Sequence, residues 1–581
     1  MRTRQITASD GVRLAVQEHG DRTNPTIVAV HGYPDDHVVW DGAVAALAER
    51  YHVVTYDVRG AGHSEAPTQR SAYGLDQLEC DLAVVVEEVS PYAPVHLLAH
   101  DWGSIQAWHA VTGDRMRGRI ASFTSVSGPC LDHAGHWFRS RLRRPSPKRL
   151  RELVTQLACS GYIGFFQLPL LPELAWRSRL LPRLLGTLER LDPAAAAQPA
   201  RPSLSDGLRG LALYRANMLA RLGGPRERRA DIPVQVLAPT GDPFVSPALQ
   251  TDIARWVPDL RIRRVPGGHW LPRTRPDVVT RCTSELVEDV EHGRQARPLR
   301  RARVGGKRPR CADQLVVITG AGSGIGRETA LAFAEQGAEI VAADRDQTAA
   351  ARTAELAGLL GPQATPYAVD VSDGAAMEDF AKHVQTELGV PDVVVNNAGI
   401  GVAGPFAETS VEDWQRVIDV NLWGVIHGCR AFAAQMTDRG EGGQIVNVAS
   451  AAAYLPSRTL SAYATTKSAV LTLSQCLRAE LASSGIGVST VCPGFVHTNI
   501  TARTRFVGLN DDGQQQRQQA ATRMYRRRNF TPDRAAREIL RTVETNAALT
   551  PITPEATAGL VLSRLTPGLL RAAARADLTP G

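Results

Sequence analysis

The stretch Leu315–Gly326, LVVITGAGSGIG, joins a short apolar run to a glycine-rich turn, and a helical pattern begins directly after it. A strand, such a turn and a helix in this order indicate an α/β domain whose backbone can approach a phosphate group closely. Further apolar runs at 339–343, 393–396, 444–449 and 488–492 alternate with helical patterns. We therefore predict a doubly wound parallel sheet for residues 313–581.

A chain of 581 residues is too long for one hydrophobic core, and the first half repeats this alternation with other motifs. Apolar runs at 26–31, 52–56 and 95–99 are each followed by a turn and a helical pattern, which is typical of a buried parallel sheet. The alternation stops after Cys130, and strand character returns at 232–238. We predict an α/β domain over residues 1–292 with a helical cap at about 131–230.

Residues 293–312 separate the two predicted domains and concentrate the excess positive charge, which amounts to +7 for the whole chain. Between Arg294 and Arg310 there are eight Lys or Arg residues and no acidic one. Like charges repel, which favours an extended, solvated linker. Contact with anionic lipid or nucleic acid is the alternative. Because no aromatic residue interrupts the run to stack on bases, we expect no nucleic-acid partner.

The cysteines and the N-terminus indicate the compartment. The eight cysteines are scattered and form no CxxC pair, so we expect neither a metal site nor a disulfide framework. The N-terminus lacks the apolar core of a signal peptide, and no uninterrupted apolar stretch is long enough to span a bilayer. We expect a cytoplasmic protein without a membrane span.

The stretch Ala99-His100-Asp101-Trp102-Gly103 lies where a predicted strand meets a helix. Small residues at such a junction allow a sharp turn that exposes the central side chain, as in a nucleophile elbow. An aspartate is poorly suited to acyl transfer, but it can attack an sp³ carbon and form an ester that water then cleaves. A strained epoxide or a carbon–halogen bond is a suitable target.

Groups that would support Asp101 follow in the chain order expected for such a site. Asp242 follows a predicted strand, and His269 lies in a glycine-rich turn. His269 would activate the water, and Asp242 would fix its tautomer and stabilise the imidazolium. The backbone amides of Tyr33 and Trp102 would form the oxyanion hole for ester hydrolysis.

Residues 1 to about 290 resemble the epoxide hydrolases of the α/β-hydrolase fold. The resemblance rests on the HGxP pattern at 31–34, the HDxG pattern at 100–103, and the late aspartate and GHxx patterns. In that family the cap donates two tyrosines that hold and protonate the epoxide oxygen. The resemblance implies this role for Tyr162 and Tyr214.

Haloalkane dehalogenases are the alternative for the same residues. They resemble this chain through Asp101 and Trp102, but they usually place a halide ligand where Tyr33 stands, and they do not need the tyrosine pair.

The later glycine spacing, Gly320-x-x-x-Gly324-Ile325-Gly326, is the form seen in short-chain dehydrogenases. Asp344 ends the next predicted strand, eighteen residues after Gly326. A carboxylate there accepts hydrogen bonds from the ribose hydroxyls and repels a ribose phosphate, so we expect NAD as the cofactor. Arg345 follows immediately and could accommodate NADP instead.

Tyr463 and Lys467 lie one helical turn apart on one face of a helix. With Ser450 and Asn421 they resemble the catalytic set of short-chain dehydrogenases, and the resemblance extends over residues 313 to about 500. Lys467 and the cationic nicotinamide would lower the phenol pKa from about 10, so that Tyr463 accepts the alcohol proton. Ser450 would orient the substrate oxygen, and Asn421 would anchor a water relay behind Lys467.

The same resemblance implies a Rossmann-type fold and a set of cofactor contacts. It assigns Asp370 and Val371 to the adenine, Asn397 to a structural turn and Thr498 to the nicotinamide, beside the glycine loop Gly320–Gly326. Residues 501–529 would cover the substrate.

The whole arrangement resembles actinobacterial fusion proteins of an epoxide hydrolase and a short-chain dehydrogenase. We therefore expect a bifunctional enzyme that opens an epoxide to a vicinal diol and transfers a hydride on an alcohol or carbonyl substrate. The alternative is an N-terminal domain kept as a binding scaffold for an active dehydrogenase. We expect small-molecule substrates, apolar or lipid-like if the apolar run 165–171 lines the pocket, and a homo-oligomer formed through the dehydrogenase domain.

Overall fold

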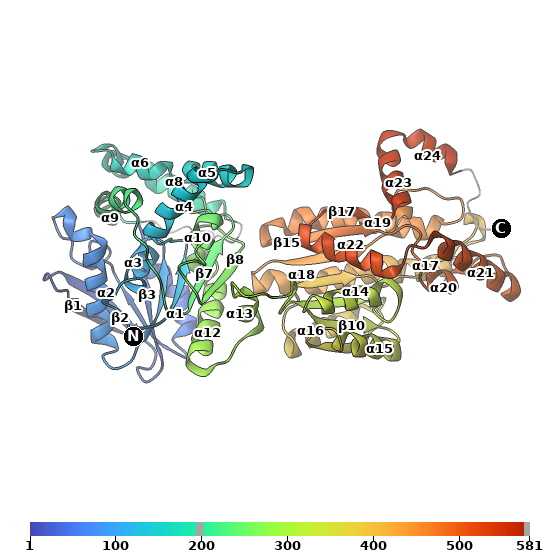
Figure 1. Ribbon diagram of the computed structural model, residues 1–581, viewed down its shortest axis with the longest axis horizontal. Helices are drawn as coiled ribbons and strands as arrows, with labels where there is room; N and C mark the ends of the chain where they lie inside the picture. The colour runs from blue at the N-terminus through green and yellow to red at the C-terminus, as the bar shows by residue number, and fades with distance from the viewer. Residues whose placement is uncertain (193, 195–201, 575–581) are drawn as a thin grey trace. The chain divides into compact units, whose positions relative to one another are not determined.

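The computed structural model describes residues 1–192, 194 and 202–574 (Figure 1). The chain divides into two compact units, Met1–Gly306 and Lys307–Gly581, and each has its own parallel-dominated sheet. We call them the N-terminal unit and the C-terminal unit.

The sheet of the N-terminal unit has the strand order β1-β2-β4-β3-β5-β6-β7-β8. β2 pairs antiparallel with both β1 and β4. The strands β4, β3, β5, β6, β7 and β8, which follow one another in the sheet in this order, are all parallel. All residues of β3, β4 and β5 are buried, which explains why these strands are continuous apolar runs in the sequence. The strands are β1 Arg2–Thr7, β2 Arg13–His19, β3 Thr26–Val30, β4 His52–Tyr56, β5 Val95–His100, β6 Ile120–Val126, β7 Val234–Pro239 and β8 Leu260–Val265.

A group of helices interrupts this sheet between β6 and β7 and forms a cap (Figure 1). Its inner side chains, including Phe166, Trp176 and Tyr214, share one hydrophobic core with Trp102 of the sheet domain. The cap therefore covers the carboxyl end of β5. The cap helices are α4 Leu131–Arg143, α5 Pro147–Cys159, α6 Gly161–Gln167, α7 Leu171–Arg177, α8 Leu180–Arg190 and α9 Leu204–Gly223, and the sheet is flanked by α1 Asp41–Leu47, α2 Leu75–Val89, α3 Trp102–Val111 and α12 Pro276–His292.

No single helix among the described residues is long and apolar enough to cross a membrane. By length and composition alone, one bent pair in the cap, Pro147–Gln167 with Leu171–Arg177, meets the criterion.

The basic run differs from the extended linker that the sequence predicted. Helix α13, Arg297–Ala302, lies within it, and Arg303 forms an isolated bridge to Arg261 of β8. The amide of Val304 donates to the carbonyl of Leu260 at 2.8 Å. Backbone hydrogen bonds thus attach this part of the run to the edge of the sheet despite its charge.

The sheet of the C-terminal unit has the order β11-β10-β9-β12-β14-β15-β17, with every pair parallel. Separate hydrophobic cores cover its two faces, one containing Val316 and Ile318, the other Leu315 and Val317. This doubly wound arrangement confirms the predicted fold. The strands are β9 Leu315–Thr319, β10 Glu339–Asp344, β11 Ala364–Ala368, β12 Val393–Asn396, β14 Gly443–Val448, β15 Ile486–Cys492 and β17 Leu549–Pro551, and the helices used below are α14 Gly324–Glu335, α19 Ser461–Glu480, α21 Asp511–Arg528 and α23 Pro554–Leu565.

Candidate active sites

Asp101 occupies the sharp turn between β5 and α3. Its φ of 49° is unusual for a residue other than glycine, and such strain is typical of a nucleophile elbow. A Cβ at Gly103 would lie 2.2 Å from the carbonyl oxygen of Val30, so only glycine fits there. The amide of Trp102 donates to Asp101 Oδ1 at 2.7 Å, which holds the carboxylate at the head of the helix.

The structure brings Asp242 and His269 to this carboxylate. Asp242 follows β7 and accepts the His269 Nδ1 proton, with distances of 3.1 and 3.0 Å to its two oxygens. The amides of Phe244 and Val245 donate to Asp242 Oδ1 at 2.9 and 3.0 Å and fix its position. His269 Nε2 lies 3.7 Å from Asp101 Oδ2. This is the geometry of a nucleophile, a base and a base-orienting acid.

The ionisation of His269 follows from these neighbours. Burial disfavours the imidazolium, but the Asp242 and Asp101 carboxylates outweigh burial and raise the pKa of His269 to about 10. Burial also opposes the charge on Asp242, yet the His269 imidazolium and the two backbone amides lower its pKa. The imidazolium is therefore the stable form of His269 while Asp101 is a free carboxylate.

The loop that carries Tyr33 lies against the elbow. A Cβ at Gly32 would stand 2.9 Å from the nitrogen of Trp102, so the chain passes directly beside the proposed oxyanion hole. The Tyr33 side chain points into the cap, where its hydroxyl donates to the carbonyl of Gly207 at 2.8 Å and accepts from Trp176 Nε1 at 2.7 Å.

Tyr162 and Tyr214 come together from different cap helices, α6 and α9. Their rings stand edge to face with centroids 5.8 Å apart, and Tyr214 packs in the same way on Trp102 at 4.9 Å. Burial, with a further contribution from the Asp101 charge, raises the pKa of Tyr162, and burial likewise raises the pKa of Tyr214. Both phenols therefore keep their protons near the nucleophile.

A polar network that the sequence analysis missed ties helix α8 of the cap to this site. Asp192 Oδ2 accepts from the amide of Gly268, the residue before His269, at 2.7 Å. Glu189 accepts from Arg273 Nε at 2.9 Å, and Arg273 also donates to Asp35 at 2.7 Å. These contacts join residues far apart in the chain, so no local pattern could have indicated them.

A cavity of about 740 Å³ in the C-terminal unit contains most of the residues predicted for the cofactor and for hydride transfer. Gly326 lies beneath its floor, where a Cβ would stand 2.2 Å from the carbonyl oxygen of Gly320. Close packing of helix on loop thus leaves the backbone exposed for a pyrophosphate. The predicted residues in the lining are Gly320, Gly324, Ile325, Asp344, Asp370, Val371, Asn397, Ser450, Tyr463, Lys467 and Thr498.

Asp344 is held at the end of β10 by the glycine loop itself. Its Oδ2 accepts from the amide of Gly322 at 2.8 Å, and its Oδ1 accepts from the amide of Asp346 at 3.0 Å. Arg345 is exposed and also lines the cavity.

Helix α19 aligns Tyr463 and Lys467 beside the cavity, and Lys467 Nζ lies 5.9 Å from the centre of the Tyr463 ring. Lys467 Nζ donates to the carbonyl of Val448 at 2.8 Å. Asn421, in a π-helical turn, accepts from the amide of Ile400 at 2.9 Å and donates to its carbonyl at 3.0 Å.

Gly399 separates Asn421 from Lys467. A Cβ at Gly399 would come 3.3 Å from Asn421 Oδ1 and 3.5 Å from Lys467 Nζ. The structure therefore brings the four predicted catalytic residues into one region, although Asn421 lies behind Lys467 and outside the lining of the cavity.

Burial governs the protonation of this second site. It lowers the pKa of Lys467 to about 8, and it raises the pKa of Tyr463, against which a hydrogen bond with Ser450 acts. The protein alone thus raises the phenol pKa, whereas we expected a lowered value in the presence of the nicotinamide. The positive charge of the cofactor would have to supply that lowering.

Some residues that line this cavity belong to no motif of the sequence. Phe495 after β15, Met524 and Tyr525 of α21, and Glu555 of α23 all line it. The predicted covering segment 501–529 therefore contributes to the wall, together with residues far beyond it.

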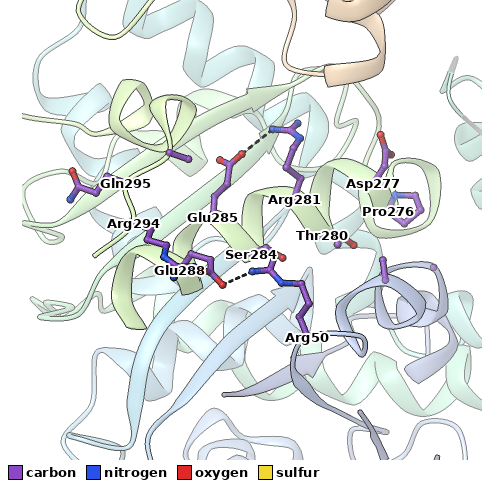
Figure 2. Close-up of a pocket in the computed structure, with 13 residues that line it drawn as sticks. Arg50, Pro276, Asp277, Thr280, Arg281, Ser284, Glu285, Glu288, Arg294 and Gln295 are labelled. Carbon is purple, nitrogen blue, oxygen red and sulfur yellow. Dashed lines mark hydrogen bonds and ion pairs between the residues drawn. The ribbon is translucent and has the colours of Figure 1, made fainter. Parts of the chain in front are cut away.

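Figure 2 shows a further cavity, of about 900 Å³, on the N-terminal unit between α1 and α12. Its charged side chains pair with one another, Arg50 with Glu288 at 2.5 Å and Arg281 with Glu285 at 3.5 Å. The residues that line it include none predicted for either site.

His37, Asp57 and His63 place potential metal-ligating atoms within 4.8 Å of one another. The Asp57 carboxylate already accepts from the amides of His37 and His63 at 2.9 Å each, and from His37 Nδ1 at 2.7 Å. Although burial opposes it, the His37 hydrogen bond helps to lower the pKa of Asp57 to about 2. Ion pairing explains this cluster, and the absence of a metal site stays a prediction.

The matches to family models follow the same division of the chain. The family model described as alpha/beta hydrolase fold matches residues 25–276, and the one described as short chain dehydrogenase matches residues 314–506. Fold and sites together define an enzyme made of an α/β hydrolase joined to a short-chain dehydrogenase. The C-terminal unit accordingly takes a nicotinamide cofactor.

Some relatives match this chain over almost its whole length. The chain is 42% identical over 585 residues to the "Probable oxidoreductase EphD" of Mycobacterium tuberculosis. The alignment of the two covers 99% of this chain and 98% of the relative. This chain therefore belongs to the EphD family of hydrolase–dehydrogenase fusion enzymes.

Among solved structures, a short chain dehydrogenase/reductase from Burkholderia phymatum in complex with NAD is 32% identical, covering 45% of this chain and 95% of that one, with a TM-score of 0.41. The Bacillus megaterium epoxide hydrolase in complex with an inhibitor is 22% identical, covering 49% of this chain and 100% of that one, with a TM-score of 0.41.

Proposed function

We propose that the N-terminal unit hydrolyses an epoxide to a vicinal diol through an ester of Asp101. The observation that carries this proposal is the grouping of Asp101 and His269 with two phenols of the cap, Tyr162 and Tyr214, that keep their protons. A carboxylate supplies the nucleophile, and a phenol supplies the acid that an epoxide oxygen needs on ring opening.

The reaction balances with these groups alone. Asp101 attacks a ring carbon, the carbon–oxygen bond breaks, and Tyr162 or Tyr214 protonates the oxygen. Water then attacks the ester carbonyl carbon while His269 takes a proton, and the Trp102 amide stabilises the oxyanion. Before the water attacks, the imidazolium proton of His269 restores the phenol. One water proton then passes through His269 to the departing diol oxygen, and the other, left on the Asp101 carboxyl group, returns to His269 and restores the imidazolium.

The pKa of His269 fits both steps. In the free enzyme, the Asp101 charge helps to raise this pKa to about 10, so His269 is an imidazolium beside the nucleophile. Formation of the ester removes that negative charge, which lowers the pKa of His269. The neutral imidazole can then act as the base for water.

The surroundings of Tyr33 favour this function over halide displacement. Its hydroxyl is engaged by Gly207 and Trp176 of the cap, so its side chain does not offer a free halide donor. The tyrosine pair has a role only in epoxide opening. Two assembled catalytic sets also argue against an N-terminal unit that serves only as a scaffold.

Mass spectrometry of the full chain with styrene oxide tests the hydrolase proposal. His269→Ala should accept the epoxide but stall at ester hydrolysis, so a covalent adduct should accumulate on Asp101. Asp101→Asn is the matched control and should form none. An adduct on another residue, with Asp101 unmodified, would overturn the nucleophile assignment.

For the C-terminal unit we propose NAD-dependent oxidation of a secondary alcohol, with the reverse reduction of a carbonyl. When bound, NAD accepts the hydride from the carbinol carbon. Tyr463 takes the hydroxyl proton, Ser450 orients the oxygen, and Lys467 with Asn421 connects the phenol to water. NAD is proposed over NADP because Asp344, fixed by the Gly322 amide, stands where a ribose phosphate would be repelled.

The test is reduction of NAD by the full chain with secondary alcohols such as α-methylbenzyl alcohol, compared with Tyr463→Phe. Loss of activity in the variant, with unchanged cofactor binding by fluorescence titration, supports the proposal. An equally active Tyr463→Phe variant would contradict it. Assembly into a homo-oligomer through this unit stays a prediction, which light scattering of the purified protein would check.

A further inference from the structure

Tyr525 on helix α21 is a half-buried phenol that neither proposed reaction uses. It lines the same cavity as Ser450 and Tyr463. Its ring stands perpendicular to that of Phe495, with centroids 5.1 Å apart. Across the described residues, none of the hydrogen bonds found involves its hydroxyl, which is therefore available to a ligand.

Contacts to the neighbouring Phe495 ring help to position this phenol. Glu555 Oε1 accepts from the amide of Phe495 at 2.8 Å, which holds the ring on which Tyr525 packs. Arg528 lies over the same Phe495 ring, 5.3 Å from its centre. The hydroxyl is therefore held at the cavity by rigid contacts to its ring, while its own hydrogen-bonding capacity is unused.

The chemical state of Tyr525 is also set. Burial, followed by the nearby Tyr463 and Glu555, raises the pKa of Tyr525, so it is a neutral phenol that both donates and accepts. The lining of the cavity also includes apolar residues, such as Leu455, Phe506 and Met524. Tyr525 thus offers a substrate a neutral donor and acceptor in the same cavity as the catalytic tyrosine.

We propose that Tyr525 hydrogen-bonds a second hydroxyl, on the carbon next to the one that is oxidised, and so selects vicinal diols. This inference rests on the proposed functions of both units, because the diol is the product of epoxide hydrolysis. In the oxidation, one carbinol carbon loses a hydride to NAD and its hydroxyl proton to Tyr463. The neighbouring hydroxyl stays intact on Tyr525, and the product is an α-hydroxy ketone.

The proposal gives the fusion a chemical reason. The first unit would supply the substrate class that the second recognises, and a tether raises the effective concentration of one site near the other to roughly the millimolar range. An epoxide with NAD should then yield diol first and hydroxy ketone afterwards.

Steady-state NAD reduction by the full chain tests the selection, with styrene glycol compared with α-methylbenzyl alcohol, which lacks the second hydroxyl. Tyr525→Phe should lower kcat/KM for the diol by about 10-fold, equivalent to about 1.4 kcal/mol, and change that for the mono-alcohol by less than about 2-fold. Tyr367→Phe, on β11 and away from the cavity, is the matched control and should change neither.

An equal effect on both alcohols, or none on the diol, would overturn the role of Tyr525 while the dehydrogenase assignment stands. Calorimetric titration of styrene glycol into the protein with NAD separates the two proposals. Diol binding that needs Tyr525, without turnover of either alcohol, would contradict the proposed oxidation and support the recognition. Neither binding nor turnover of the diol would overturn the inference.

Discussion

The two active sites place charge in buried surroundings in opposite ways. In the N-terminal unit, Asp101, Asp242 and His269 balance one another, with His269 3.7 Å from one carboxylate and 3.0 Å from the other. In the C-terminal unit, Lys467 donates to a backbone carbonyl and has no carboxylate partner among the groups that set its pKa. Under the proposed functions, the hydrolase site carries all its charges in the protein, whereas the dehydrogenase site would depend on the charge of its cofactor.

This contrast has a consequence for catalysis. In the mechanism proposed for the hydrolase site, esterification of Asp101 removes a negative charge, so one histidine can be an imidazolium in the first step and a base in the second. In the mechanism proposed for the dehydrogenase site, the positive charge of a cofactor bound in the cavity of about 740 Å³ would lower the phenol pKa. Substitutions should therefore affect the two sites independently and with different pH dependence.

Two variants, each of which disables one site, should give the largest effects on activity. Asp101→Asn removes the nucleophile and should lower epoxide hydrolysis by about 10⁴-fold or more, with NAD reduction by added alcohol unchanged. Tyr463→Phe removes the acid–base group and should lower NAD reduction by about 10²- to 10⁴-fold, with epoxide hydrolysis unchanged. Both rates are measured on each full-length variant. A large loss of both activities in either variant would show that the sites are coupled.

The second-largest difference between the two sites is expected in the pH dependence of their reactions. Because the pKa of His269 is raised to about 10, the imidazolium persists between about pH 6 and pH 9, and alkylation of Asp101 should vary little there. Alcohol oxidation needs the Tyr463 proton removed, and burial raises that pKa, so the rate should rise with pH, about tenfold per unit below the pKa. Quenched single-turnover mass spectrometry and initial rates of NAD reduction measure the two. If the rates of alkylation and of NAD reduction changed with pH in the same way, the proposed difference between the two sites would be wrong.

The sequence predicted both folds because buried parallel strands are continuous apolar runs, and β9 and β12 begin and end where those runs do. It also predicted groupings that depend on local spacing, such as Asp101 in its turn and Tyr463 with Lys467 on one helix face. These patterns are set by neighbouring residues, and the structure groups them as expected.

Other features depend on contacts between distant segments and have no local pattern. Asp192 meets Gly268 across many residues of intervening chain, and Tyr525 reaches the cavity from a helix whose sequence is mostly polar. The basic run looked like a linker because charge alone was visible, while the backbone bonds that attach it to Leu260 were not. Tertiary structure decides such cases.

A third test concerns the preference of the dehydrogenase site for NAD over NADP. Asp344→Ala should weaken the binding of NAD and strengthen the binding of NADP. The ratio of the NADP dissociation constant to the NAD dissociation constant should therefore fall by about tenfold, or about 1.4 kcal/mol. The carboxylate no longer accepts from the ribose hydroxyls or repels the phosphate. Fluorescence titration with the reduced cofactors measures both constants, and Arg345→Ala serves as the complementary variant. Tighter NADP binding by the unmodified protein would mean that Arg345 decides the preference.

The smallest effect is expected at Asp192, which positions the catalytic base through the backbone. Its carboxylate accepts from the Gly268 amide at 2.7 Å, one residue before His269. Asp192→Ala should leave this amide without its partner, loosen the turn and slow ester hydrolysis by about 3-fold to 10-fold, within the range of a lost charge-assisted hydrogen bond. Attack by Asp101 does not need His269 as a base, so adduct formation should keep its rate and the adduct should become detectable. Asp114→Ala, whose side chain is almost fully exposed, is the control and should resemble the unmodified protein. If alkylation and hydrolysis slow together in Asp192→Ala, the residue stabilises the cap as a whole, and the hydrolase site would lack the independent control of its base that distinguishes it from the dehydrogenase site.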